Sequence, residues 1–384
     1  MASARGAGTG AMKMHLRSRK RDFASSAAIT SSSPSAKSPK DRVVKSKLTS
    51  SVGPIVIAPS SPTLTALKKQ ALKGQNDAKV LLKYPNLVSA KLIRRYKRFL
   101  ADVVLLNGAD KAEKPLDGNS DDAETEDVQE KEDVVTIYVP NTGPMVGLLD
   151  EPYARVQLSK SDGPKRKYAY TLEMIQIHNG ERHVWVGVHS SSANRMVERA
   201  LMSRWIPELG EYDVVRREVK FAKNSRVDFV LTTNADDGSV THEKYVEVKS
   251  VTLALENADD TSQRCAVFPD TVSTRAQKHV IELTELLATK TSTTAQESKD
   301  GDDSTTSSKV SGAIIFLVQR DDCHEFAPSI QHDKKFAELC SLAAKSGIQL
   351  LAYECALEPD ETNNCGAVRL LGPLPQRKRF IFEK

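Results

Sequence analysis

The sequence predicts a mixed α/β protein (α+β overall), in which a small OB-like β-barrel is followed by a mixed-sheet α/β domain. Three observations lead to this prediction. Five short strand-like runs fill residues 86–190 without a long helix between them. From residue 191 to 384, helical and strand-like patterns follow in the order α-β-β-β-α-β, then α-β. The centre of this second region is a hairpin that carries two carboxylates and a lysine.

Residues 1–85 form a basic leader. The 384-residue chain has a net charge of +5, but residues 1–74 alone carry +12, and they are rich in Ser, Ala, Lys, Arg and Pro. Such a composition cannot bury enough apolar surface to fold, so we expect the leader to be disordered. A basic leader with few acids is typical of a mitochondrial or plastid transit peptide. The basic cluster at 17–21 favours nuclear localisation instead. If the leader is only a solvated tail, the protein would stay in the cytoplasm. No apolar run is long enough for a transmembrane helix, so no membrane association is expected.

The barrel is predicted from short runs of apolar residues separated by turn residues. The expected strands are 90–106, 134–139, 154–159, 168–177 and 183–189. Residues 110–133 carry a net charge of −8 and read as a disordered acidic insert in the loop after the first strand.

Basic residues on the barrel are interleaved with aromatic ones. One cluster surrounds Tyr96 and Phe99, and another precedes Tyr168. Cations beside aromatic rings suit a groove that follows a nucleic-acid backbone and stacks bases, although a solvated charged face explains the same pattern. Outside the leader and the acidic insert the chain is near neutral, so the overall charge is no argument for nucleic acid.

The second domain is predicted in order from residue 191. A helix begins at Ser191–Asn194, strands follow at 213–221, 226–231 and 244–251, and a second helix covers 275–287. Residues 291–309 read as a low-complexity insert, followed by a strand at 313–318, a helix around Phe336 and a strand at 348–356. The five cysteines form no C-x-x-C or zinc pattern, which favours reduced, structural thiols.

The hairpin between residues 226 and 249 carries the candidate chemistry. Glu247 and Lys249 are two residues apart, so both leave the same face of a strand, and the hairpin can bring Asp228 beside them. Buried carboxylates need a partner, and Mg²⁺ binds one or two of them together with water and phosphate oxygens. We therefore predict Asp228 and Glu247 as metal ligands and Lys249 as the group that orients an attacking water. The alternative is a surface hairpin with an ordinary Glu/Lys pair.

Many short motifs follow one another along residues 90–375. They include R-Y-K-R-F-L-A-D-V at 95–103, P-N-T-G at 140–143, A-N-R-x-V-E at 193–198, N-S-R-V-D-F at 224–229, V-E-V-K-S-V-T-L at 246–253 and R-A-Q-K-H at 275–279. In this order they resemble the sugar fermentation stimulation protein (SfsA-like) family. The resemblance implies an OB-like domain followed by a PD-(D/E)-x-K restriction-endonuclease-like domain, DNA binding, and a link to the regulation of carbohydrate metabolism. Val139 departs from the family pattern, which usually has Cys there.

The resemblance also implies roles for single residues. Asp228 matches the hairpin acid of such nucleases, Glu247 and Lys249 match the E-x-K, and Glu198 or Glu218 would supply a further catalytic carboxylate. The residues expected to contact nucleic acid are Arg95, Lys97, Arg98, Lys165, Arg166, Lys167, Arg195, Arg217, Arg226, Arg275, Gln277 and Lys278.

Three functions remain open from the sequence. The first is a phosphodiesterase that uses Mg²⁺ or Mn²⁺ and acts on nucleic acid, most simply DNA. The second is a catalytically silent DNA-binding module on a nuclease fold. The third is binding of another phosphorylated ligand, although no nucleotide-binding glycine motif is present.

Overall fold

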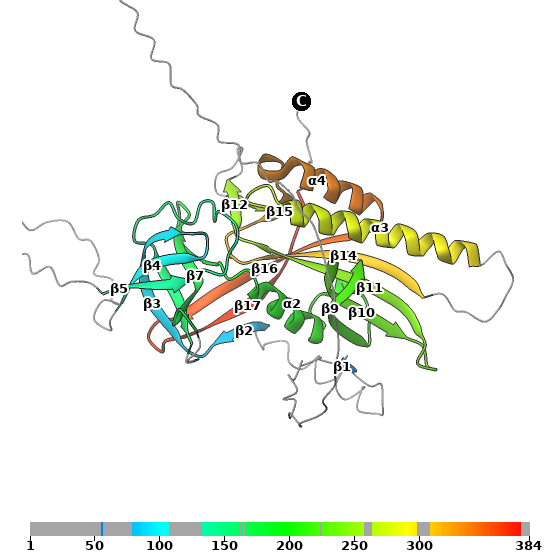
Figure 1. Cartoon of the computed structure of the whole chain (residues 1–384), viewed down its shortest axis with the longest axis horizontal. Helices are drawn as coiled ribbons and strands as arrows, with labels where there is room; N and C mark the ends of the chain where they lie inside the picture. Colours follow the sequence, from blue (N-terminus) through cyan, green and yellow to red (C-terminus); the bar gives the residue numbers. More distant parts are fainter. Residues whose placement is uncertain are drawn as a thin grey trace, which may run out of the picture. The chain divides into compact units, whose positions relative to one another are not determined.

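The computed structural model describes residues 55–56, 79–106, 133–161, 163, 166–222, 225–256, 263–297 and 308–377 (Figure 1). Nearly all of the leader, the acidic insert up to residue 132 and Lys165 lie outside these ranges, so the predictions made for them stay predictions.

The first domain is the expected barrel, built from a six-stranded sheet. Its strand order is β5-β4-β3-β6-β7-β8, and an additional parallel pairing of β5 with β7 joins strands from the two halves of that order. Alternate side chains fill its interior, among them Ile137, Val156 and Ile175, each fully buried. The bounds are β3 Leu87–Tyr96, β4 Leu100–Leu105, β5 Val134–Tyr138, β6 Arg155–Lys160, β7 Tyr170–His178 and β8 His183–Gly187.

The single strand predicted at 90–106 was wrong in one respect, because the chain forms a hairpin there. β3 ends at Tyr96 and β4 begins at Leu100. Lys97 and Arg98 make the turn with φ angles of 46° and 63°, a left-handed conformation that usually calls for Gly or Asn. The turn was missed because its residues carry no such signal.

The second domain is organised around an eight-stranded mixed sheet of order β1-β9-β10-β11-β14-β16-β17-β2. β9, β10 and β11 are antiparallel neighbours, whereas β11, β14 and β16 run parallel. The bounds are β1 Ile55–Val56, β2 Val80–Tyr84, β9 Val214–Ala222, β10 Ser225–Asn234, β11 Val240–Val251, β14 Lys309–Val318, β16 Gln349–Asp360 and β17 Cys365–Leu374.

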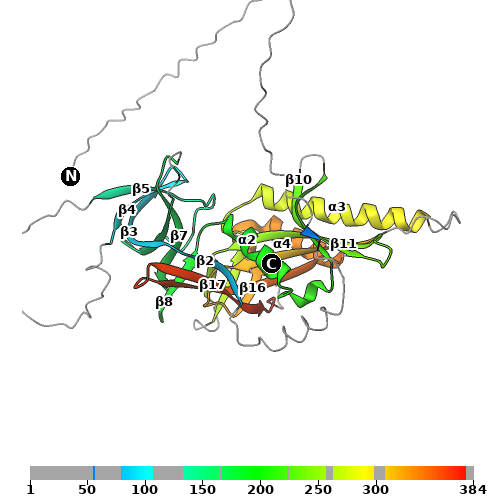
Figure 2. The ribbon, with the colours of Figure 1, turned by 90° about the horizontal axis from the view of Figure 1, so that it is seen from below.

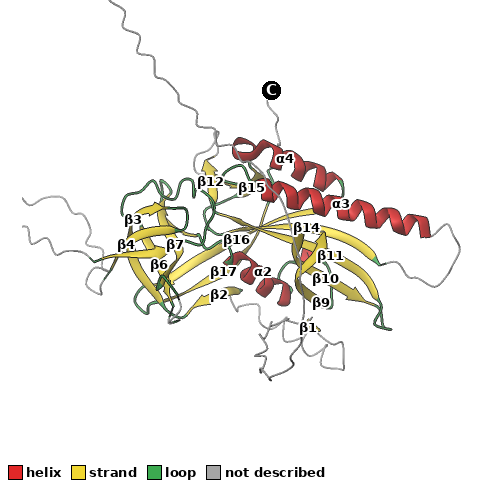
Figure 3. Ribbon diagram, viewed as in Figure 1, coloured by secondary structure: helices red, strands yellow, loops and turns green. Residues whose placement is uncertain are grey.

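Helices cover both faces of this sheet (Figure 3). α2 (Ser192–Met202) packs Met196, Val197 and Leu201 into the core on one face. α3 (Thr274–Glu297) and α4 (Ile330–Lys345) pack together on the other face, where the predicted apolar stripe of α3 is buried. Parallel strands need crossover connections, and α3 and α4 provide them.

Several short strands escaped prediction. Residues 80–84 were predicted as part of the disordered leader. They form β2 instead, which pairs with β17 (Figure 2). A separate three-stranded sheet contains β12 (Leu253–Glu256), β13 (Arg264–Phe268) and β15 (Glu325–Pro328). α3 also continues to Glu297, which corrects the start of the insert predicted at 291–309.

The cysteines of the described chain are free thiols, and four of the five are buried. Burial raises the pKa of Cys340 to about 12, which keeps this thiol protonated and unreactive. No helix in the described part of the chain is long and apolar enough to cross a membrane.

Candidate active site

The hairpin β10–β11 brings the predicted acids together. Phe229 pairs with Val246, and the backbone N–H of Val248 donates a hydrogen bond of 2.7 Å to Oδ2 of Asp228. Val246 and Val248 face the core beneath α2. Because side chains alternate along a strand, Glu247 and Lys249 leave the opposite face, towards α3.

Glu247 lies in a buried ionic cluster. Its Oε1 lies 2.5 Å from Nζ of Lys249 and also accepts a hydrogen bond from Nδ1 of His279 on α3. Glu247 and Lys249 are only 4% and 8% exposed, so this charge pair is largely removed from water. Burial by itself raises the pKa of Glu247, but Lys249 and His279 outweigh that effect and hold the pKa below its ordinary value.

The pKa of Asp228 is shifted in the opposite direction from that of Glu247. Burial, and then the neighbouring charge of Glu247, raise its pKa to about 6. The amide of Asn194 on α2 donates to its Oδ1 at 2.7 Å, which fixes the carboxylate between α2 and β11. A perturbed carboxylate beside a buried Glu/Lys pair is characteristic of functional sites.

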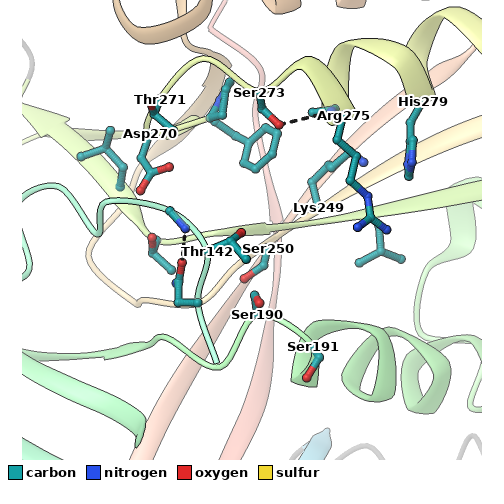
Figure 4. Close-up of a pocket in the computed structure, with 18 of the residues that line it drawn as sticks. Thr142, Ser190, Ser191, Lys249, Ser250, Asp270, Thr271, Ser273, Arg275 and His279 are labelled. Atoms are coloured by element: carbon teal, nitrogen blue, oxygen red, sulfur yellow. Dashed lines mark hydrogen bonds between the residues drawn. The ribbon is translucent and has the colours of Figure 1, made fainter. Parts of the chain in front are cut away.

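These side chains line a cavity of about 730 Å³. In Figure 4, Arg275 and His279 extend from α3 towards Lys249, while Ser190 and Ser191 form the opposite wall. The first turns of α2 and α3 both border the cavity. Helix N-termini favour anions, and hydroxyl groups can donate hydrogen bonds to phosphate oxygens, so this lining suits a phosphate group.

A loop of the barrel forms the remaining wall. Arg95 donates from Nη1 to the carbonyl of Gly143 and from Nη2 to that of Asn141, both at 2.8 Å. The backbone N–H of Met145 donates to Asp270 of the second domain at 3.1 Å. The cavity is therefore completed by both domains. Arg95 holds this loop in place, and its contact with nucleic acid stays a prediction.

Of the five predicted catalytic residues, the structure brings Asp228, Glu247 and Lys249 to the cavity. Glu198 instead forms an ion pair with Arg217 at 2.9 Å. Glu218 is exposed on β9 with a φ of 49°, and a left-handed residue breaks the side-chain alternation that would turn it inwards. Among the described residues, neither lines the cavity.

The predicted nucleic-acid contacts separate into groups. Arg98 and Arg275 line the cavity. Gln277 is buried against Asp333 of α4, with contacts of 2.8 and 3.0 Å, so its amide serves the packing of the two helices, and its contact with nucleic acid stays a prediction. The other described members, apart from Arg95, lie outside the cavity lining and are exposed: Lys97, Arg166, Lys167, Arg195, Arg217, Arg226 and Lys278.

A divalent cation in this cavity would be held by Asp228 and Glu247. Within the described ranges, no group of three His, Cys, Asp or Glu residues is placed to bind a metal ion, so water and substrate oxygens would complete the coordination. The two carboxylates are hard oxygen donors, as a cation such as Mg²⁺ requires. They repel each other electrostatically, and a bound cation would offset that repulsion.

Sequence reasoning overlooked Asn194 and Asp270 as parts of the site and left His279 without a defined role. Asn194 and His279 stand in the motifs A-N-R and R-A-Q-K-H, and Asp270 ends F-P-D. The first two motifs were noted as matches to a family, but only the fold shows that the three residues meet at Asp228, Glu247 and the barrel loop.

The fold and the site together define a class of protein: an OB-like barrel joined to a restriction-endonuclease-like domain. The comparisons agree, since an SfsA N-terminal OB domain matches residues 93–188 and a sugar fermentation stimulation protein RE domain matches 191–295 and 304–361. The chain belongs to the sugar fermentation stimulation protein (SfsA) family.

Relatives and one solved structure support this assignment. The chain is 37% identical to the sugar fermentation stimulation protein homolog of Acaryochloris marina over 281 residues, covering 73% of this chain and 91% of that one. It is 35% identical to the homolog of Synechocystis over 294 residues, covering 76% and 98%. The structure of Pyrococcus furiosus SfsA in complex with Ca²⁺ has a similar fold, with a TM-score of 0.54 and 21% identity over 78% of this chain and 100% of that chain.

Proposed function

We propose that this protein binds DNA and hydrolyses its phosphodiester bonds with a divalent cation, Mg²⁺ or Mn²⁺. The observation that carries the proposal is the meeting of Asp228, Glu247 and Lys249 in one cavity of about 730 Å³. The solved Pyrococcus furiosus relative is described as a complex with Ca²⁺, which supports a divalent cation in this family fold.

The protein's own groups have distinct tasks. Asp228 and Glu247 hold the cation, which when bound lowers the pKa of a water and offsets phosphate charge. Lys249 donates to Oε1 of Glu247 in the free protein, and its ammonium group is then placed to orient the attacking water or to contact the phosphate. Arg275 and Arg98 approach the cavity from the two domains and can each contact a phosphate.

The proposal is tested with the full-length chain and labelled DNA in Mg²⁺, Mn²⁺ or EDTA. We expect metal-dependent cleavage that falls by at least about a hundredfold in Asp228→Asn and in Glu247→Gln, because each loses a ligand of the cation. Glu198→Gln is the matched control, since this acid lies outside the cavity lining and should leave cleavage intact. Equal cleavage by all variants, or cleavage in EDTA, would contradict the assignment.

A second candidate is a DNA-binding module without turnover. The observation favouring it is that Lys249 and His279 already compensate the charge of Glu247. In that case the protein would bind DNA with an affinity that falls steeply as the salt concentration rises. No cleavage product would form, with or without substitution of Glu247. If the unaltered protein cleaves DNA and only the variants of Asp228 and Glu247 lose cleavage, the protein is a nuclease and not a binding module alone.

A further inference from the structure

The barrel carries an exposed aromatic pair that the proposed hydrolysis does not use. Phe99 and Tyr138 are each 39% exposed, although large aromatic side chains are usually covered in a small domain. Their ring centroids lie 6.5 Å apart with an interplanar angle of 26°, so the two partly exposed rings are stacked.

The pair stands next to the cavity wall. Phe99 follows Arg98, which lines the cavity. Tyr138 ends β5, and a few residues later the chain reaches Asn141, Thr142 and Gly143 of the same wall. The backbone N–H of Val139 donates to the carbonyl of Phe99 at 2.8 Å, which fixes the two segments beside each other.

Cationic side chains flank the pair on both sides. Lys97 and Arg98 are exposed in the turn before Phe99. Tyr138 pairs with Thr171, whose hydroxyl accepts a hydrogen bond of 3.3 Å from Arg166. Exposed rings between positive charges match a chain that alternates flat bases with anionic phosphates.

We propose that Phe99 and Tyr138 form a stacking platform for unpaired bases, which makes single-stranded DNA the preferred substrate. This inference rests on the proposed function of the cavity. Stacking of a base on an aromatic side chain tightens binding by about five- to 150-fold, whereas the paired bases inside a duplex present no free faces. The platform holds a strand whose phosphate backbone continues past Arg98 to Lys249.

The test measures binding of full-length Phe99→Ala, Tyr138→Ala and the double variant to a 20-nucleotide single strand and to the matching duplex. EDTA is present so that no cleavage occurs. We expect each single variant to lose about tenfold in affinity for the single strand and less than about twofold for the duplex. Phe99→Tyr, which keeps a ring, should retain affinity. Leu371→Ala removes a 51% exposed apolar side chain from β17 and is the control for nonspecific surface effects.

An independent readout uses a single strand that carries 2-aminopurine, whose fluorescence changes on stacking. The change should occur with the unaltered chain and disappear in the double variant.

Equal losses for single strand and duplex, or no loss in either, would overturn the platform. The outcome is separable from that of the hydrolysis. Cleavage that depends on Asp228 without ring-dependent binding would overturn only the platform. Ring-dependent binding of single strands without cleavage would overturn only the hydrolysis.

Discussion

At the scale of single residues, Asp228 makes the stability of the protein depend on pH. Its pKa is raised from 3.8 to about 6, first by burial, so the folded state binds this proton more tightly than the unfolded chain does. The free energy of unfolding should therefore fall as the pH rises from about 4 to about 6, by an amount on the order of 2–3 kcal/mol from this group. Asp228→Asn removes that slope.

The measurement is urea unfolding of both proteins in EDTA at several pH values. The free energy of unfolding of Asp228→Asn, relative to that of the wild type, should rise between about pH 4 and pH 6 and then level off at higher pH. Curves that stay parallel would contradict a buried carboxylate with a raised pKa. Any constant offset reflects hydrogen bonds that Asn makes differently to Asn194 and Val248.

The candidate site could be predicted only where neighbours in sequence are neighbours in space. Strand alternation placed Glu247 and Lys249 on one face, and the hairpin placed Asp228 beside them. The role of Arg95 depends on carbonyls of Asn141 and Gly143, more than 40 residues away. A basic residue among aromatics looks the same in the sequence whether it binds a phosphate or its own backbone.

At the scale of elements, Gln277 joins α3 to α4 through Asp333. Gln277 is 8% exposed, and its amide donates a hydrogen bond to Asp333, which is 3% exposed. Asp333 also accepts a hydrogen bond of 2.9 Å from the backbone N–H of Ser273, just before α3 begins. Gln277→Ala would leave a buried carboxylate with fewer donors, so we expect about 2 kcal/mol of destabilisation.

Lys278→Ala is the matched control, because Lys278 is exposed and has only a 3.5 Å pair with Glu282. Its effect on chemical denaturation should stay below about 0.5 kcal/mol. Gln277→Ala should keep the affinity of the folded protein for DNA. A loss of DNA affinity without a loss of stability would support Gln277 as a substrate contact.

The elements predicted correctly are those with a strong period or a strong apolar run. The apolar stripe of α3 and the apolar run of β14 fall in that group. β2 and β12 are four or five residues long, and they form strands because β17 and β13 offer free edges. Short runs of this kind acquire their structure from tertiary pairing, which local patterns do not contain.

At the scale of the whole folded region, the barrel contacts the second domain close to the candidate active site, because the contact leads to Ser250 in the cavity lining. The backbone N–H of Gly187 at the end of β8 donates to the carbonyl of Gln319 at 2.9 Å. The amide of Gln319 in turn donates to Ser250 at 2.6 Å, next to Lys249. A change at this contact therefore reaches β11, the strand that carries Glu247 and Lys249, through the side chain of Gln319.

Gly187→Ala tests that connection. An added Cβ would lie 2.5 Å from Oε1 of Gln319 and 2.9 Å from Leu357, and both of these side chains are buried. We expect destabilisation of about 1–3 kcal/mol. Cleavage should also weaken, because Gln319 can relieve the clash only by moving away from Ser250.

Gly372→Ala is the control, since a Cβ there would meet no described atom within 4 Å. It should leave both stability and cleavage unchanged. The decisive comparison is cleavage per folded molecule at a temperature where both variants stay folded. If Gly187→Ala then cleaves as well as Gly372→Ala, the barrel contact at Gly187 stabilises the fold without positioning β11.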